Sequence, residues 1–220
     1  MFSIKSFFQQ YETEKVSLTI QNKPFSFLIP KKLDQFIDEK DVLKQFPLWA
    51  KIWESSLVLS DYLVSHYKSP KRILELGAGL GVNSIIASSL GHQVTLTEFD
   101  PHAFQFAQAN ASINSCHTID FRMLDWQSPD VESKFDMIVG SELIDKESVF
   151  AAMSHFFHHY LLNDGEIILA NELRKTSKLF FDTMTQTYNI QIWRKKLRAS
   201  DKEKTILLSR FTVKDENSAL

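Results

Sequence analysis

The amino-acid sequence predicts an α/β fold, in which a doubly wound and mostly parallel sheet ends in an antiparallel C-terminal hairpin. Two observations predict it. From residue 72 onward, short apolar runs alternate with segments of helical periodicity, which is typical of parallel strands joined by helices on both faces of the sheet. The last two apolar runs are separated only by a short polar turn, which is typical of a hairpin. Together these runs indicate a Rossmann-like sheet of seven strands.

The composition is that of one globular domain. The chain has 220 residues with 44% hydrophobic side chains, and its net charge of −2 includes no long basic run that would favour a nucleic-acid partner. Cys116 is the only cysteine, so an internal disulfide and a thiolate-rich metal site are excluded. The first ten residues lack the apolar region of a signal peptide, and no segment is apolar enough to span a membrane. We therefore expect a cytoplasmic protein without nucleic-acid or membrane partners, and the oligomeric state stays open.

Residues 1–46 differ in character from the rest of the chain and are expected to form an N-terminal extension. Residues 16–20 alternate apolar and polar side chains, and a polar turn separates them from a second apolar run at 25–29, which predicts a β-hairpin. Residues 31–45 are charged and predict no definite element. We expect this hairpin and helix extension to pack on the main domain.

The main domain is expected to span residues 47–215, with 216–220 as a tail. Trp49 and Trp53 lie four residues apart, and Leu57 and the apolar residues after it continue the same spacing. The pattern predicts one amphipathic helix that includes both tryptophans.

Five strand–helix units and a terminal hairpin follow. Apolar runs predict strands at 73–76, 94–97, 119–123, 135–139, 166–170, 190–197 and 205–212. Helical segments are predicted at 82–90, from 101 onward, at 149–162 and at 177–188. Gly91 has the position of a helix C-cap, Pro101 that of a first helical residue, and residues 163–165 are typical of a turn.

Distinctive residues occur where the first four of these strands end. In chain order they are Glu75, Gly77, Gly79, Gly81, Glu98, Asp100, Asp125, Trp126, Ser141 and Glu142. A doubly wound sheet binds its ligand outside the carboxyl ends of its strands, so we expect these residues to surround one site. An acid that closes the second strand suits the two hydroxyls of a ribose, because a carboxylate can accept both hydrogen bonds.

The glycine spacing distinguishes between nucleotide ligands. Dinucleotide folds use Gly-x-Gly-x-x-Gly, and the pattern here is Glu-x-Gly-x-Gly-x-Gly from Glu75 to Gly81, which disfavours a nicotinamide dehydrogenase. This pattern resembles motif I of the class I S-adenosylmethionine-dependent methyltransferases. The resemblance extends to the acid at Glu98, to residues 124–126 and to residues 135–140. It implies S-adenosylmethionine as the cofactor.

One branch of these enzymes fits best. Residues 47–60, together with Leu124-Asp125-Trp126, resemble the seven-β-strand protein-lysine methyltransferases, a family that includes bacterial relatives once described as nicotinamide N-methylases. The resemblance implies that Trp53 flanks the methionine end of the cofactor and that Trp126 lies beside the adenine. The cofactor-binding residues it implies are Trp53, Glu75, Gly77, Gly79, Gly81, Glu98, Asp100, Asp125, Trp126 and Ser141.

Glu142 is the expected catalytic residue, because a carboxylate there could position the arriving ammonium of a lysine. The family has an acid-x-x-Tyr signature after the fourth strand, and here Asp145 stands where the aromatic residue is expected. The methyl acceptor is therefore a protein lysine or, as an alternative, a small molecule in an N- or O-methyltransferase. A non-catalytic module that binds S-adenosylmethionine is a further alternative. No metal site is expected, because the nearby histidines at 155, 158 and 159 have no acid or cysteine partner.

Overall fold

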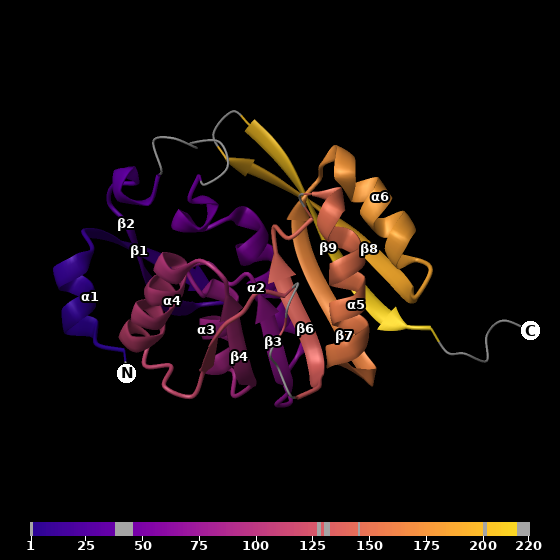
Figure 1. The fold of residues 1–220 in the computed structure, drawn as a ribbon, viewed down its shortest axis with the longest axis horizontal. Helices are drawn as coiled ribbons and strands as arrows, with labels where there is room; N and C mark the ends of the chain where they lie inside the picture. The colour runs from indigo at the N-terminus through magenta and orange to yellow at the C-terminus, as the bar shows by residue number, and fades with distance from the viewer. Residues whose placement is uncertain are drawn as a thin grey trace, which may run out of the picture.

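A seven-stranded sheet forms the centre of the computed structural model, which describes residues 2–37, 46–126, 129, 133–144, 146–199 and 202–214 (Figure 1). The strands are β3 (Arg72–Leu76), β4 (Gln93–Glu98), β5 (Asp120–Met123), β6 (Phe135–Ser141), β7 (Leu161–Glu172), β8 (Tyr188–Ala199) and β9 (Lys202–Val213). Their order is β5-β4-β3-β6-β7-β9-β8. Strands β3 to β7 pair in parallel, and β9 lies antiparallel between β7 and β8. The predicted fold class is confirmed.

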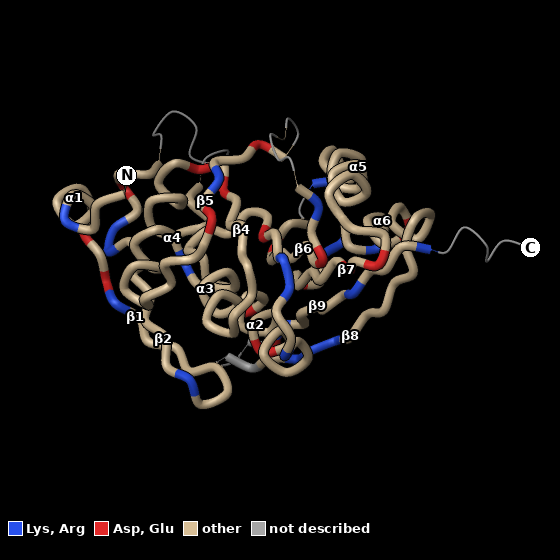
Figure 2. The backbone as a smooth tube through the Cα atoms, turned by 90° about the horizontal axis from the view of Figure 1, so that it is seen from below, with Lys and Arg blue, Asp and Glu red and all other residues tan. Residues whose placement is uncertain are grey.

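Helices cover both faces of this sheet. They are α2 (Glu54–His66), α3 (Val82–Ser89), α4 (Pro101–Ile113), α5 (Phe150–Tyr160) and α6 (Lys175–Met184). Because successive side chains of a strand point to opposite faces, Ile73 packs with residues of α2, α3 and α4, whereas Leu74 packs with residues of α5 and α6. Figure 2 shows α5 and α6 on one side of the sheet and α2 and α3 on the other. The apolar run of β3 is therefore buried on both faces, as predicted.

The N-terminal segment contributes a short helix and the predicted hairpin. These elements are α1 (Ile4–Gln10), β1 (Thr13–Ile20) and β2 (Lys23–Pro30), and the two strands pair antiparallel. Asn110 of α4 joins the hairpin to the main sheet layer. Its Oδ1 accepts the Leu28 N–H at 2.6 Å, and its Nδ2 donates to the carbonyls of Leu28 at 3.2 Å and Leu80 at 3.0 Å. One buried amide thus connects β2, α4 and the turn after β3.

The prediction of one helix through both tryptophans is wrong in its first part. Leu48–Ala50 form a single 3₁₀ turn, Lys51 and Trp53 have extended backbone, and α2 begins only at Glu54. The indole N–H of Trp53 donates to the Leu48 carbonyl at 2.8 Å, so a side-chain contact stabilises a turn where the apolar spacing favours a helix. The spacing of apolar residues cannot predict such a contact.

Two further differences concern the ends of strands. Residues 163–165, predicted as a turn, lie inside β7, where the register shifts between the pairs Phe135–Leu161 and Met137–Glu166. The third predicted strand–helix unit has its strand, β5, but the described residues between β5 and β6 form no helix. Residues 200 and 201 of the predicted hairpin turn and the predicted tail at 216–220 lie outside the described residues.

Candidate active site

The turn after β3 has a backbone that only glycine adopts readily. Its φ angles are +58° at Gly77, +54° at Gly79 and +77° at Gly81, all in the left-handed region. A Cβ at Gly81 would lie 3.2 Å from Leu96 Cδ1 and 3.3 Å from Ala107 Cβ. The third glycine therefore lets the start of α3 pack closely against β4 and α4.

Glu75 is buried beneath this turn and ties β3 to α3. Its carboxylate accepts hydrogen bonds from Asn83 Nδ2 at 2.9 Å, from the Ser84 N–H at 2.8 Å and from the Ser84 hydroxyl. Burial raises the pKa of Glu75 to about 7, although these hydrogen bonds act in the opposite direction. The Ser60 hydroxyl of α2 holds Asn83 in turn, at 2.9 Å.

Glu98 ends β4 and contacts the same turn from the side. Its Oε2 accepts the Gly79 N–H at 2.7 Å, and its Oε1 accepts the N–H groups of Phe99 at 2.7 Å and Asp100 at 3.0 Å. Burial raises the pKa of Glu98, and the three N–H donors oppose this effect. A carboxylate has about four acceptor positions, so one position on Oε2 is left for a ligand hydroxyl.

A pocket of about 180 Å³ opens at this edge of the sheet, between the glycine turn and the segment before α2. Its lining includes several of the residues predicted from the sequence: Trp53, Gly77, Gly79, Glu98, Ser141 and Glu142. Leu143 also lines the pocket and packs against two glycines: a Cβ at Gly77 would lie 3.0 Å from Leu143 Cδ2, and a Cβ at Gly140 only 2.4 Å from Leu143 Cδ1. The two glycines leave the space that this leucine side chain fills.

The tryptophan segment forms the wall opposite the glycine turn. A Cβ at Gly79 would lie 3.5 Å from the Cβ of Trp49, whose ring packs at 5.3 Å from that of Phe106. The Trp53 ring lies under the ammonium of Lys51, with 3.5 Å between Nζ and the ring centroid. Both tryptophans and Lys51 line the pocket, so an aromatic and cationic wall faces the turn.

Glu142 follows β6 in a backbone conformation that is unusual for a glutamate. Its φ is +58°, and its N–H donates to the Ala170 carbonyl at 3.0 Å. Its carboxylate accepts the Glu172 N–H at 2.9 Å and pairs with Arg174, whose Nη2 lies 2.8 Å from Oε2. The ends of β6 and β7 thus hold this carboxylate in one orientation at the pocket.

Asn171 supports the turn that carries Glu142. With its amide oxygen directed at that turn, it accepts the N–H groups of Glu142 at 3.1 Å, Leu143 at 2.7 Å and Ile144 at 3.0 Å. Asn171 is buried, and its amide oxygen gives the N–H groups of Leu143 and Ile144 an acceptor, while the Glu142 N–H is shared between this oxygen and the Ala170 carbonyl. Asn171 therefore supports the backbone that presents Glu142 to the pocket. Asp145, which stands where the acid-x-x-Tyr signature has its aromatic residue, lies outside the described residues.

Five of the predicted site residues do not line this pocket: Glu75, Gly81, Asp100, Asp125 and Trp126. Asp100 is the N-cap of α4, and its Oδ1 accepts the N–H groups of the next two non-proline residues at 2.7 and 3.0 Å. Trp126 packs at the edge of the apolar cluster under α5 and α6, and Asp125 is exposed.

Several lining residues carry no local sequence signal. Ser56 shares a hydrogen bond of 2.9 Å with the Ser141 hydroxyl, and Leu143 lines the pocket beside Glu142. Ser56 lies one turn into α2, so its distance in sequence from the strand ends concealed it. Arg174 also lines the pocket, and no local sequence pattern indicates its ion pair with Glu142.

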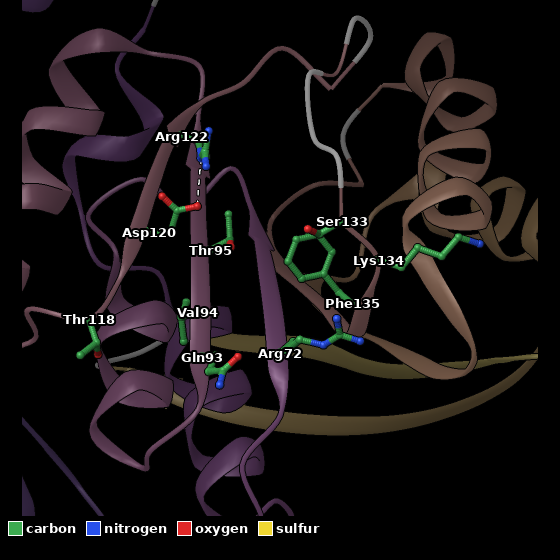
Figure 3. Close-up of a pocket in the computed structure, with 10 residues that line it drawn as sticks. All are labelled: Arg72, Gln93, Val94, Thr95, Thr118, Asp120, Arg122, Ser133, Lys134 and Phe135. Atoms are coloured by element: carbon green, nitrogen blue, oxygen red, sulfur yellow. Dashed lines mark hydrogen bonds and ion pairs between the residues drawn. The ribbon is translucent and has the colours of Figure 1, made fainter.

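A larger depression of about 610 Å³ lies at the opposite edge, near the amino ends of β3, β4 and β6 (Figure 3). Its two arginines have acidic neighbours: Arg122 Nε lies 2.9 Å from Asp120, and Arg72 Nε lies 3.6 Å from Asp136. Ligands of doubly wound sheets bind at the carboxyl edge, so we assign the site to the smaller pocket. Over the described residues, no cluster of three His, Cys, Asp or Glu could hold a metal ion, and no helix could cross a membrane.

Comparison with known proteins identifies close sequence relatives. A family model described as lysine methyltransferase matches residues 39–187. Protein N-lysine methyltransferase METTL21A of Xenopus tropicalis is 34% identical over 151 residues, which cover 66% of this chain and 70% of that protein. EEF1A lysine methyltransferase 3 of the same species is 27% identical, with coverage of 63% and 66%.

Solved structures share the fold at low sequence identity. The N-methyltransferase NodS of Bradyrhizobium japonicum WM9, in complex with S-adenosyl-L-homocysteine, superposes with a TM-score of 0.61 at 15% identity, over 83% of this chain and 97% of that one. A ribosomal protein L11 methylase of Lactobacillus delbrueckii subsp. bulgaricus gives a TM-score of 0.56 at 21% identity, with coverage of 72% and 77%.

Proposed function

Because this chain belongs to the lysine methyltransferase family, a methyltransferase family that uses S-adenosylmethionine, we propose that it methylates a lysine side chain of a protein. One observation carries the proposal: the glycine turn, Glu98 and Glu142 converge on a single pocket at the carboxyl edge of the sheet. A cofactor side and an acceptor side are thus present within one site.

The residues present fit the cofactor. Gly77 and Gly79 present bare backbone to the pocket, in a left-handed conformation that a residue with a side chain would rarely adopt. Glu98 keeps one acceptor position for a ribose hydroxyl, next to the Gly79 N–H. We assign Trp53, Gly77, Gly79, Glu98 and Ser141 to contact with the cofactor. When bound, S-adenosylmethionine supplies a methyl group on a positively charged sulfur, already activated for direct displacement.

Residues outside the lining have supporting roles in this proposal. Glu75 and Gly81 shape the glycine turn, and Asp100 caps the helix that follows Glu98. We place Asp125 and Trp126 at the adenine end of the site, beyond the pocket as it stands. The catalytic domain would span residues 47–215, and the contacts of Asn110 support packing of the N-terminal extension on it.

The acceptor side consists of Glu142 and its neighbours. A free lysine has a pKa of about 10.4, so it arrives at neutral pH as an ammonium, which a carboxylate attracts. Glu142 has two of its four acceptor positions filled, by Glu172 and Arg174, and the others can orient the acceptor nitrogen. The remaining task is alignment of that nitrogen with the methyl carbon, which the pocket walls provide by restricting its approach.

The test is transfer of a labelled methyl group to an extract of the cell that makes the protein. A labelled protein band supports the proposal. Label only in a small metabolite would instead support a small-molecule N- or O-methyltransferase, which the absence of an aromatic residue at position 145 favours as the second candidate. No label at all, although S-adenosylhomocysteine binds, would indicate a non-catalytic module.

Glu142 itself is tested with two variants in the same assay. We expect Glu142→Ala to lower transfer at least 100-fold, the usual scale for a lost acid–base or positioning group, while cofactor affinity stays within a few-fold. Glu142→Gln keeps the size but not the charge, so it separates electrostatics from shape. Full activity in both variants would remove Glu142 from the mechanism.

A further inference from the structure

The ion pair between Glu142 and Arg174 lies in the wall of the pocket where the acceptor must enter. The Arg174 guanidinium and the Glu142 carboxylate are 2.8 Å apart, and their side chains are 30% and 12% exposed. Both residues line the pocket. A partly desolvated pair of this kind interacts more strongly than one in open solvent.

This pair matters because the reaction needs an uncharged amine. A lysine ammonium has no lone pair with which to attack a methyl group. A carboxylate near an ammonium raises the pKa of that ammonium, whereas a cation nearby lowers it. Glu142 without a counter-charge would therefore attract the substrate and at the same time hold it in its unreactive form.

We propose that Arg174 is a positioning residue that sets the protonation state of the acceptor lysine, an inference that rests on the proposed function. Its guanidinium offsets the charge of Glu142, so the lysine releases its proton to solvent as it enters the pocket. The neutral amine then donates a hydrogen bond to Glu142 and presents its lone pair to the methyl group. The nitrogen–carbon bond forms as the sulfur–carbon bond breaks, and the positive charge passes from sulfur to nitrogen.

Other charged groups around the pair leave this role to Arg174. Among the described residues, the other charged side chains that line the pocket are Lys51 and Glu98, and Lys204 of β9 interacts electrostatically with Glu142, Glu54 and Glu172. Lys204 is engaged by Glu54, with 2.8 Å between Nζ and Oε1, and Lys51 lies over the Trp53 ring. Arg174 is the cation that contacts the Glu142 carboxylate directly. Loss of its charge would leave the Glu142 carboxylate at the pocket without the cation that it contacts.

The test compares Arg174→Gln and Arg174→Lys with the wild type. The acceptor is the protein labelled in the extract experiment, purified, and kcat and KM are measured from about pH 7 to pH 10 with saturating S-adenosylmethionine. The pH profile of kcat reports the acceptor in the bound complex. In Arg174→Gln, we expect the apparent pKa of the amine to rise by about one unit, so that kcat near pH 7.5 falls about tenfold and recovers at high pH. KM should not rise, because the ammonium still meets Glu142.

Controls separate this role from a structural one. Arg174→Lys retains the charge and should keep the wild-type pH profile. Arg72→Gln removes an ion-paired arginine at the other edge of the sheet and should leave the profile unchanged. Arg174 also caps the start of α6, where its backbone N–H donates to the Ser177 hydroxyl. Because this donor belongs to the backbone, the substitutions preserve the hydrogen bond.

Three results would overturn the inference. The first is a loss of kcat in Arg174→Gln by the same factor at every pH, and the second is a pH shift in Arg174→Lys equal to that in Arg174→Gln. The third is tenfold weaker binding of S-adenosylhomocysteine to Arg174→Gln by calorimetry, which would place the guanidinium on the cofactor. Failure of the proposed function is distinguishable from all three, because the wild type would then label no protein.

Discussion

Replacement of Glu75 by glutamine tests the electrostatics beneath the glycine turn. The carboxylate is buried and its pKa is about 7, against an ordinary value of 4.5. A raised folded-state pKa means that the folded protein binds the proton more tightly than the unfolded chain does. The stabilisation is therefore complete below about pH 4.5 and is lost as the pH rises through 7. A difference of about 2.5 pKa units corresponds to about 3 kcal/mol.

Glu75→Gln cannot ionise and lacks this loss of stability. Its amide oxygen can accept from the N–H and hydroxyl of Ser84, and its NH₂ can donate to Asn83 once the Asn83 amide has turned. The Ser60 hydroxyl, which donates to Asn83 Oδ1 in the wild type, can then accept from Nδ2, so every hydrogen bond has a replacement. Between pH 5 and pH 8, we expect the free energy of unfolding of the variant to rise by about 2.5 kcal/mol relative to the wild type. Urea unfolding followed by tryptophan fluorescence measures this difference at each pH. Parallel stability curves for the two proteins over this range would refute the reasoning.

Three further substitutions test the turn and its supports. Gly79→Arg should abolish binding of S-adenosylhomocysteine by calorimetry because the side chain enters the pocket, whereas Gly91→Arg, with a similar positive φ and no atom within 4 Å of its Cβ, should bind normally. Gly81→Ala should lower the free energy of unfolding by about 2 kcal/mol, from the left-handed backbone and the close contacts of its Cβ; an unchanged urea midpoint would argue against that packing. Asn110→Ala removes the hydrogen-bond partner of three backbone groups in β2 and the glycine turn, so it should lower the free energy of unfolding by about 3 kcal/mol in the same assay. An unchanged urea midpoint would show that the hairpin packs independently of this amide.

The sequence predicted the fold well where one local pattern decides the structure. Ile73 and Leu74 belong to an apolar run without turn residues, and the strand they form is buried on both faces. Alternate glycines before a helical segment predicted the turn, and the left-handed φ angles there explain why glycine is required. The hairpin of β1 and β2 followed in the same way from two apolar runs around a polar turn.

Features that depend on distant contacts were not predictable from local patterns. The start of α2 at Glu54 depends on the hydrogen bond from the Trp53 indole to Leu48, which periodicity does not represent. Glu142 and Arg174 lie 32 residues apart in the chain, and their ion pair forms because β6 and β7 are neighbours in the sheet. Leu143 lines the pocket beside two glycines that leave space for it, and this arrangement appears only in three dimensions.

The central claim is that the methyl group goes to a lysine nitrogen of a protein. The most direct measurement is acid hydrolysis of the labelled protein band, followed by chromatography against Nε-methyl-lysine standards. We expect the label to elute with methylated lysine, and we expect no label when Gly79→Arg or Glu142→Ala replaces the wild type. Label that elutes with another amino acid, or wild-type amounts from Glu142→Ala, would contradict it.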